Sequence, residues 1–173
     1  LGYRTDQAAC LPRADHADIE AWLRMRISLA AAYVGKQVAV SFNGWPCPVV
    51  SAEALARVVC AGDPDAGVLA TKARADEKPY ADHPWDVAFV VSPNIKLFAH
   101  TSVLSGVVTA RGPHLTHFKR IVNDAVQKKV RLAAKDRANE TTAATSCRNL
   151  HMVVIGALPG ADWTGQRKDE LQI

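Results

Sequence analysis

Three short apolar segments follow one another in the middle of the chain without a helical pattern between them. They cover residues 86–92, 95–99 and 103–110. Residues 87–91 are apolar without a break, which is typical of a strand buried on both faces, and 95–99 alternates as a half-buried strand does. Consecutive strands that are joined by short turns pair as hairpins. The centre of the chain therefore predicts a sheet built mainly by antiparallel pairing.

Helical patterns surround these segments at 15–34, 51–62 and 113–136, and Ser51 is expected to cap the second helix. The first helix carries an apolar stripe at three- and four-residue steps, formed by Ile19, Trp22, Leu23, Ile27, Ala30, Ala31 and Val34. This stripe is expected to face the core.

Further strands are expected at 37–43 and 151–158. The element order is then α-β-α-β-β-β-α-β. That order predicts the α+β class, with a mainly antiparallel sheet of about five strands and three helices on one face. Trp45 and Trp85 flank proline-containing corners and are expected to be packing anchors, because lone aromatics at such corners usually bury apolar area.

The chain has 173 residues, of which 49% are hydrophobic and 22% charged. This composition excludes a disordered chain and predicts one domain, residues 1–173. Within it, 1–14 is expected to be an extended arm, 62–84 a long loop and 159–173 a polar tail. Loops as long as 62–84 are often functional, and a connection without a role is the alternative.

The positive charge is concentrated in one segment. The whole chain carries +4, but 111–137 holds eight Lys or Arg against two Asp and is +6, which leaves −2 for the rest. The expected contact residues are Lys119, Arg120, Lys128, Lys129 and Arg131. A basic helix can dock on an acidic protein or on phosphates, and the alternative is a solvated face. A protein partner is favoured over nucleic acid or an anionic membrane, because the helix offers no exposed aromatic for stacking.

Four cysteines, Cys10, Cys47, Cys60 and Cys147, are spread widely and form no Cys-x-x-Cys pair. An even number fits two disulfides in an oxidising compartment, with the pairing left open, and four reduced core cysteines are the alternative. The triplet that begins at Asn139 is a glycosylation sequon. Together these features favour a secreted, extracellular protein.

Short catalytic motifs are absent. The sequence has no glycine-rich phosphate loop, no nucleophile elbow and no H-E-x-x-H. We therefore expect no cofactor, and a non-enzymatic protein is favoured over an enzyme. His114 and His117 are one helical turn apart, but no third ligand is signalled, so they are expected to be exposed rather than metal-bound.

Two further histidines offer an enzymatic alternative. His100 and His151 lie near the ends of expected strands and could act as acid and base in phosphodiester cleavage. The segment 86–100 is loosely similar to a hairpin of microbial guanyl-type ribonucleases, although the expected glutamate and arginine are not identifiable. The alternative function is therefore a secreted nuclease-like hydrolase.

In overall make-up the chain resembles the small secreted effectors of plant-pathogenic fungi, which are virulence proteins. The resemblance rests on the few cysteines, the absent motifs and the biased charge, and on no diagnostic residue. It implies a secreted, non-enzymatic protein that binds a partner protein, with a host protein and entry into a host cell among the options. The basic helix is the expected docking surface.

Overall fold

The computed structural model describes residues 16–73, 85–133, 148–164 and 170–172. The predicted arm 1–14 lies outside this part of the chain. The elements in chain order are α1 (His16–Val34), the 3-10 turn η2 (Gly35–Gln37), β1 (Ser41–Phe42), β2 (Trp45–Pro46), α2 (Ala52–Val59), β3 (Gly67–Ala73), β4 (Trp85–Val91), β5 (Ala99–Leu104), β6 (Val107–Val108), α3 (Pro113–Ala133), β7 (Leu150–Gly156), β8 (Asp162–Thr164) and β9 (Glu170–Gln172).

The main sheet has five strands in the order β3-β4-β7-β5-β6. The α+β class with three α-helices in the described part is confirmed. The expectation of a mainly antiparallel sheet is wrong, because the sheet is mixed and β5 runs parallel to β7. The reason is the burial of β7, whose residues 152–156 are all buried. A strand that is apolar on both faces takes a central place, so β7 inserts between β4 and β5 and separates the expected hairpin.

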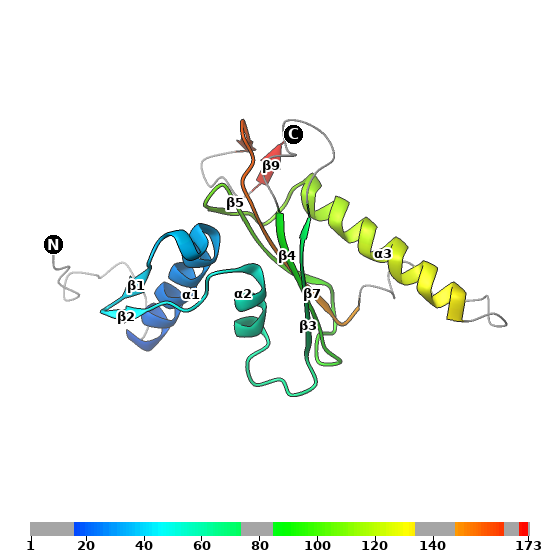
Figure 1. The fold of residues 1–173 in the computed structure, drawn as a ribbon, viewed down its shortest axis with the longest axis horizontal. Helices are drawn as coiled ribbons and strands as arrows, with labels where there is room; N and C mark the ends of the chain where they lie inside the picture. The colour runs from blue at the N-terminus through cyan, green and yellow to red at the C-terminus, as the bar shows by residue number, and fades with distance from the viewer. Residues whose placement is uncertain (1–15, 74–84, 134–147, 165–169, 173) are drawn as a thin grey trace.

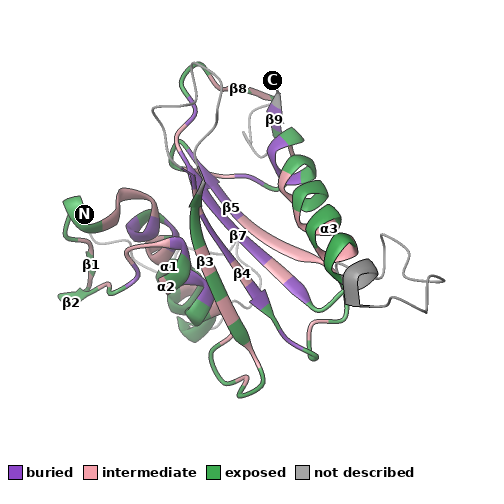
Figure 2. Cartoon of the chain, turned by 45° about the vertical axis from the view of Figure 1, so that its right-hand side comes forward, coloured by how far each residue is buried: buried purple, intermediate pink, exposed green. Residues whose placement is uncertain are grey.

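The helices cover both faces of the sheet rather than one (Figure 1). Helices α1 and α2 pack on the face that carries Ala88, Val90 and Val153. The start of α3 and strand β9 pack on the other face. That second cluster contains Trp85, Val87, Leu104, Leu115, Met152, Val154, Leu158 and Leu171. Burial concentrates in the strands, whereas most of α3 is exposed as it leaves the sheet (Figure 2).

Several strand boundaries differ from the prediction. Residues 67–73, in the expected long loop 62–84, form the edge strand β3. The polar tail 159–173 contributes β8 and β9. The expected strand 95–99 does not form, and the next strand, β5, begins only at Ala99. Ser105 and Gly106, both with positive φ, turn the chain between β5 and β6, so 103–110 is not one strand.

Of the predicted stripe only Ala31 is buried in helix α1, which has the expected extent. Its buried residues are Leu29, Ala31 and Ala32, all in its last turns, whereas Trp22 is 61% exposed. The 37–43 strand shrinks to β1, which turns through Asn43 and Gly44, both with positive φ, into β2. None of the helices in the described part of the chain is both long enough and apolar enough to cross a bilayer.

The start of α2 was predicted correctly. Ser51 is its N-cap, and its side chain accepts a hydrogen bond from the backbone N–H of Ala54 at 3.1 Å. The Oδ2 of Asp86, on β4, accepts a second one from the N–H of Ala52 at 2.9 Å. These two acceptors fix the helix end against the sheet.

Candidate functional site

The N-terminal end of α3 is anchored on the sheet by an aromatic and polar cluster. The ring of Trp85 stacks on His114 at a centroid distance of 6.3 Å and meets Phe118 edge-on at 5.5 Å. The Nε2 of His114 lies 3.0 Å from the Oγ of Ser102. Burial, and to a lesser degree the positive charge of His100, lowers the pKa of His114 to about 4. His114 is therefore a neutral core residue at neutral pH, and its expected exposure is wrong.

Strand β9 closes this cluster from the C-terminal side. The N–H of Leu171 donates to the carbonyl of Arg111 at 3.1 Å, and the Leu171 side chain is buried. Gly112 is confined between Leu171 and His114, because a Cβ there would lie 2.8 Å from the His114 ring. The Nδ1 of His114 is buried and has no hydrogen-bond partner in the part of the chain that is described.

Ser102 and His114 form a hydroxyl–imidazole pair, but the pair is structural. Both side chains are buried, at 1% and 5% exposure, so no substrate reaches them. Their role is to hold the first turn of α3 against β5. The sequence analysis missed Ser102, because nothing in the spacing of the two residues shows that α3 folds back over β5.

His100 and His151, the candidate acid and base, lie on opposite faces of the sheet. The parallel register places His151 beside Ala99 and His100 beside Met152. Because successive residues of a strand point to opposite faces, the side chains of the two histidines lie on opposite faces of the sheet. The Nε2 of His100 contacts the carbonyl of Ala110 at 2.9 Å, whereas the Nε2 of His151 lies 2.9 Å from the Oγ1 of Thr101. The two imidazoles cannot act on one bond.

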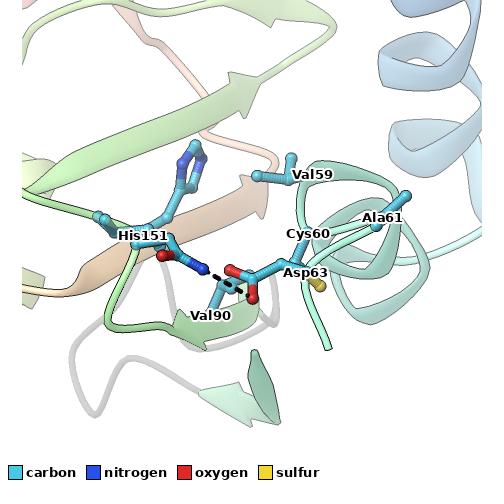
Figure 3. A pocket seen from close by; sticks show the side chains of 9 residues that line it. Val59, Cys60, Ala61, Asp63, Val90 and His151 are labelled. Atoms are coloured by element: carbon cyan, nitrogen blue, oxygen red, sulfur yellow. Dashed lines mark hydrogen bonds between the residues drawn. The ribbon is translucent and has the colours of Figure 1, made fainter. Parts of the chain in front are cut away.

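A cavity of about 390 Å³ lies between the end of α2 and the sheet, lined by Val59, Cys60, Ala61, Gly62, Asp63, Val90, Asn94, Ile95 and His151 (Figure 3). Asp63 accepts hydrogen bonds from Ser92 and from Nδ2 of Asn94, and the bond from Ser92 lowers the pKa of this carboxyl group. The imidazole of His151 points away from Asp63 in Figure 3. The Asp63 carboxylate therefore stabilises the 92–95 turn. Asp63 and His151 do not form an acid–base pair in this cavity.

The cations of α3 are exposed, as expected, but they do not form one face. Lys119 and Lys128 are nine residues apart, which at 100° per residue puts them on opposite sides of the helix. Arg120 and Lys129 have the same separation. The ion pairs among the described residues are Arg24–Glu20 and Arg57–Glu53, and neither involves α3. Positive charge therefore surrounds the projecting helix, whose Arg131 side chain lies outside the described part.

The remaining candidate residues have mixed outcomes. Trp85 is a packing anchor, but Trp45 is 73% exposed at the β1–β2 turn, so that prediction is wrong. Cys47 and Cys60 do not bond to each other. The other two cysteines and Asn139 lie outside the described residues, so disulfides and glycosylation stay predictions. Among the described residues, no three His, Cys, Asp or Glu side chains gather as a metal site.

The fold is similar to the ATPase regions of type II DNA topoisomerases. The ATPase region of Saccharomyces cerevisiae topoisomerase II superposes with a TM-score of 0.67 and 19% identity, over 94% of this chain and 38% of that one. The B-subunit of DNA gyrase from Myxococcus xanthus gives 0.65 and 19%, over 88% and 50%. The ATPase and transducer domains of Balamuthia mandrillaris topoisomerase II give 0.65 and 15%, over 86% and 34%. At these identities the likeness establishes the fold.

The sequence itself is similar to a particular enzyme of this kind, DNA topoisomerase 2 of African swine fever virus. The identity is 42% for the Kenya and Malawi isolates and 41% for the Badajoz strain, over 174 aligned positions and 100% of this chain. The chain spans 14% of the length of these relatives. No protein-family model matches the sequence.

These similarities overturn the functional expectations. The resemblance to fungal effectors was compositional, whereas the similarity to a viral DNA topoisomerase extends over the whole chain. The secreted location, the virulence role, the host-protein partner and the nuclease-like alternative are therefore wrong. Ranking DNA below a protein partner was also wrong, because the relatives are DNA topoisomerases.

Proposed function

We propose that the chain is one segment of a type II DNA topoisomerase and belongs to its ATPase region. The observation that carries this proposal is the 42% identity with DNA topoisomerase 2 across the entire chain. The likeness to the solved ATPase regions of two type II topoisomerases and to a gyrase B-subunit, each with a TM-score of at least 0.65, supports the same placement.

Within that region, the chain corresponds to the part that does not itself hold ATP. Ser92 and Ser102 are buried, and their hydroxyl groups are hydrogen-bonded within the fold, so neither is left free to hold a ligand. The sequence contains no glycine-rich phosphate loop. Since one related structure comprises an ATPase domain and a transducer domain, we assign the chain to the transducer-like part. No step of ATP hydrolysis is assigned to its residues.

The direct contact of this segment with DNA is assigned to α3. Its exposed Lys119, Arg120, Lys128 and Lys129 have no carboxylate partner among the described residues. Cations on opposite sides of a projecting helix suit a phosphate backbone, which presents charge along its whole length and needs no matched pocket. The absence of exposed aromatics on α3 argues against single-strand stacking and favours contact with duplex phosphates.

Charge reversal tests this assignment. In the complete polypeptide that contains this chain, Lys119, Arg120, Lys128 and Lys129 are changed together to Glu. A matched control changes Lys36, Lys72, Lys96 and Arg148 to Glu, which alters the net charge equally at exposed sites outside α3. We expect duplex affinity to fall on the order of 100-fold in the α3 variant at about 0.1 M salt, and much less in the control.

Two outcomes would oppose the proposal. Equal losses in both variants would show that net charge, rather than α3, governs binding. If the unmodified complete polypeptide fails to relax supercoiled DNA in the presence of ATP, the assignment to a topoisomerase fails, whatever α3 binds.

A further inference from the structure

The cavity between the end of α2 and the sheet combines apolar walls with one charged group (Figure 3). Its volume of about 390 Å³ lies in the range of sites that hold small molecules. Val90 in its lining is fully buried, whereas Val59 and Ile95 are half-buried. Ala61 and Asn94 are exposed, so the cavity opens to solvent beside them. A solute with a hydrocarbon part can therefore enter it.

The charge in this cavity belongs to Asp63, whose carboxylate accepts hydrogen bonds from neutral donors. Those donors are the Ser92 hydroxyl, the Nδ2 of Asn94 and the backbone N–H of Asp65, the last two at 3.1 Å. The bond from Ser92 is the largest influence on the pKa of Asp63, which lies below its ordinary value. The carboxylate is thus ionised at neutral pH, and its negative charge is held in place without being neutralised.

The cations near this cavity are engaged elsewhere. Arg57, in the last turn of α2, pairs with Glu53 at 2.7 Å. The Nζ of Lys96 lies 3.0 Å from the carbonyl oxygen of Pro93. The ion pairs among the described residues do not include Asp63, and no described Lys or Arg lines the cavity. A positive charge from outside the chain therefore meets an available carboxylate.

Two further features of the lining favour a cation. The C-terminal end of α2 carries the negative end of the helix dipole. His151 is neutral at neutral pH, because burial, and to a lesser degree the positive charge of His100, lowers its pKa. Its Nε2 lies 2.9 Å from the Oγ1 of Thr101, which fixes the ring. The imidazole thus adds a polar surface to the cavity without repelling a positive charge.

We propose that this cavity binds a small organic ammonium ion, with its nitrogen at the Asp63 carboxylate and its hydrocarbon part against Val59, Val90 and Ile95. The carboxylate supplies the charge that an ammonium group requires, and the three aliphatic side chains supply the apolar surface. The inference does not depend on the assignment of the chain to a topoisomerase, because it uses groups of this chain alone.

A titration with hexylammonium chloride, followed by NMR of the 173-residue chain, tests the proposal. Hexanol is the uncharged analogue of equal length, and sodium chloride at the same ionic strength is the salt control. We expect saturable shifts of the His151 and Ile95 signals with hexylammonium, and an affinity for hexanol that is weaker by about fivefold. Equal affinity for the two solutes would overturn the proposal, as would shifts that sodium chloride reproduces.

Two variants, each with a matched control, locate the ammonium group. Asp63→Asn should weaken hexylammonium binding about fivefold, whereas Asp65→Asn removes an exposed carboxylate outside the lining and should leave it unchanged. Val59, whose side chain points toward His151 in Figure 3, fills the cavity when changed to Phe, so Val59→Phe should abolish the shifts. Val58→Phe, at an exposed neighbour outside the lining, should not.

The two variants fail independently, because Asp63 also holds the 92–95 turn and Val59 does not. Binding that survives Val59→Phe would place the amine elsewhere and overturn the proposal, even if Asp63→Asn disturbs the fold. Equal effects of Asp63→Asn and Asp65→Asn would overturn it as well.

The complete polypeptide separates a dissolved amine from a lysine of the remaining chain. Saturation-transfer NMR observes the ligand and therefore suits a large protein. Hexylammonium should bind the complete polypeptide and lose about fivefold in affinity with Asp63→Asn. If it binds the 173-residue chain alone, another part of the polypeptide fills the cavity, and the proposal of a ligand site fails.

Discussion

The Oγ of Ser102 and the Nε2 of His114 lie 3.0 Å apart in the core and join β5 to the first turn of α3. The sheet therefore holds the helix through one polar contact surrounded by aromatic rings. Because α3 otherwise projects from the body, this joint determines how the basic helix is oriented relative to the sheet (Figure 1).

The buried histidine makes stability depend on pH. The pKa of His114 is lowered to about 4 from 6.5, so between these values the unfolded chain binds a proton that the folded chain does not. Stability is therefore fully present above pH 6.5 and falls as the pH is lowered toward 4. We expect a loss on the order of 2 kcal/mol between pH 7 and pH 4.5, measured by urea unfolding of the 173-residue chain.

His114→Gln should flatten this pH dependence, and His117→Gln, which alters an exposed residue of the same helix, should not. His151, whose pKa burial also lowers, will leave a residual slope of the same sign. An undiminished slope in His114→Gln would show that the His114 imidazole titrates normally in the folded chain.

Gly156 on β7 is required by the close approach of Trp85. A Cβ at Gly156 would lie 2.6 Å from the indole ring, and the ring is held by His114 and Phe118. We expect Gly156→Ala to destabilise the chain by about 1–3 kcal/mol, as overpacking of a core does. Gly67→Ala is the matched control in a strand, because nothing lies within 4 Å of the added Cβ there.

Denaturant unfolding measures both glycine variants. The combination of Gly156→Ala with Trp85→Leu should destabilise less than the sum of the single changes, because the smaller side chain makes room for the methyl group. Additive losses would indicate that the strain at Gly156 does not come from the indole.

The start of α2 and the burial of β4 were readable from the sequence, because each depends on local chemistry. Ser51 directly precedes a helical repeat of apolar residues and therefore predicts an N-cap. Residues 87–91 are apolar without a break and therefore predict a buried strand. The parallel pairing of β5 with β7 could not be predicted. Both are short apolar strands, and the periodicity of a strand does not indicate which other strand it pairs with. For the same reason His100 and His151 could not be placed on opposite faces until the register was known.

The assignment of β3 to a loop and the expected burial of the α1 stripe were wrong because both depend on packing that local sequence does not show. β3 was assigned to a loop because only Val68 and Leu69 within it are large and apolar, which is sufficient for an edge strand but not for a recognisable pattern. The stripe through Trp22 was expected to be buried because apolar periodicity marks a face that packs, without saying whether the partner lies in the same segment. Likewise, the charge of the α3 cations alone does not distinguish a surface that binds phosphates from one that binds carboxylates.

The two acceptors at the start of α2 should contribute separately to stability. Ser51→Ala removes the acceptor of the Ala54 N–H and should cost about 1 kcal/mol, while Ser51→Asp preserves it. Asp86→Ala removes the acceptor of the Ala52 N–H and a negative charge near the positive end of the helix dipole. Urea unfolding of the three variants provides the comparison. Equal stability of Ser51→Ala and the unmodified chain would contradict the cap.

The salt dependence of duplex binding should report how many α3 cations touch phosphates. Each cation that neutralises a phosphate contributes about −0.9 to the slope of log affinity against log salt concentration. We expect Lys128→Ala with Lys129→Ala to make the slope less steep by about 1.8, whereas Lys36→Ala with Lys72→Ala should leave it unchanged. Fluorescence anisotropy with a labelled duplex over a range of salt concentrations gives both slopes. Because Lys128 and Lys129 are adjacent, and therefore about 100° apart around the helix, a change of only about 0.9 would mean that one flank of α3 meets the backbone. No change would remove α3 from the DNA contact.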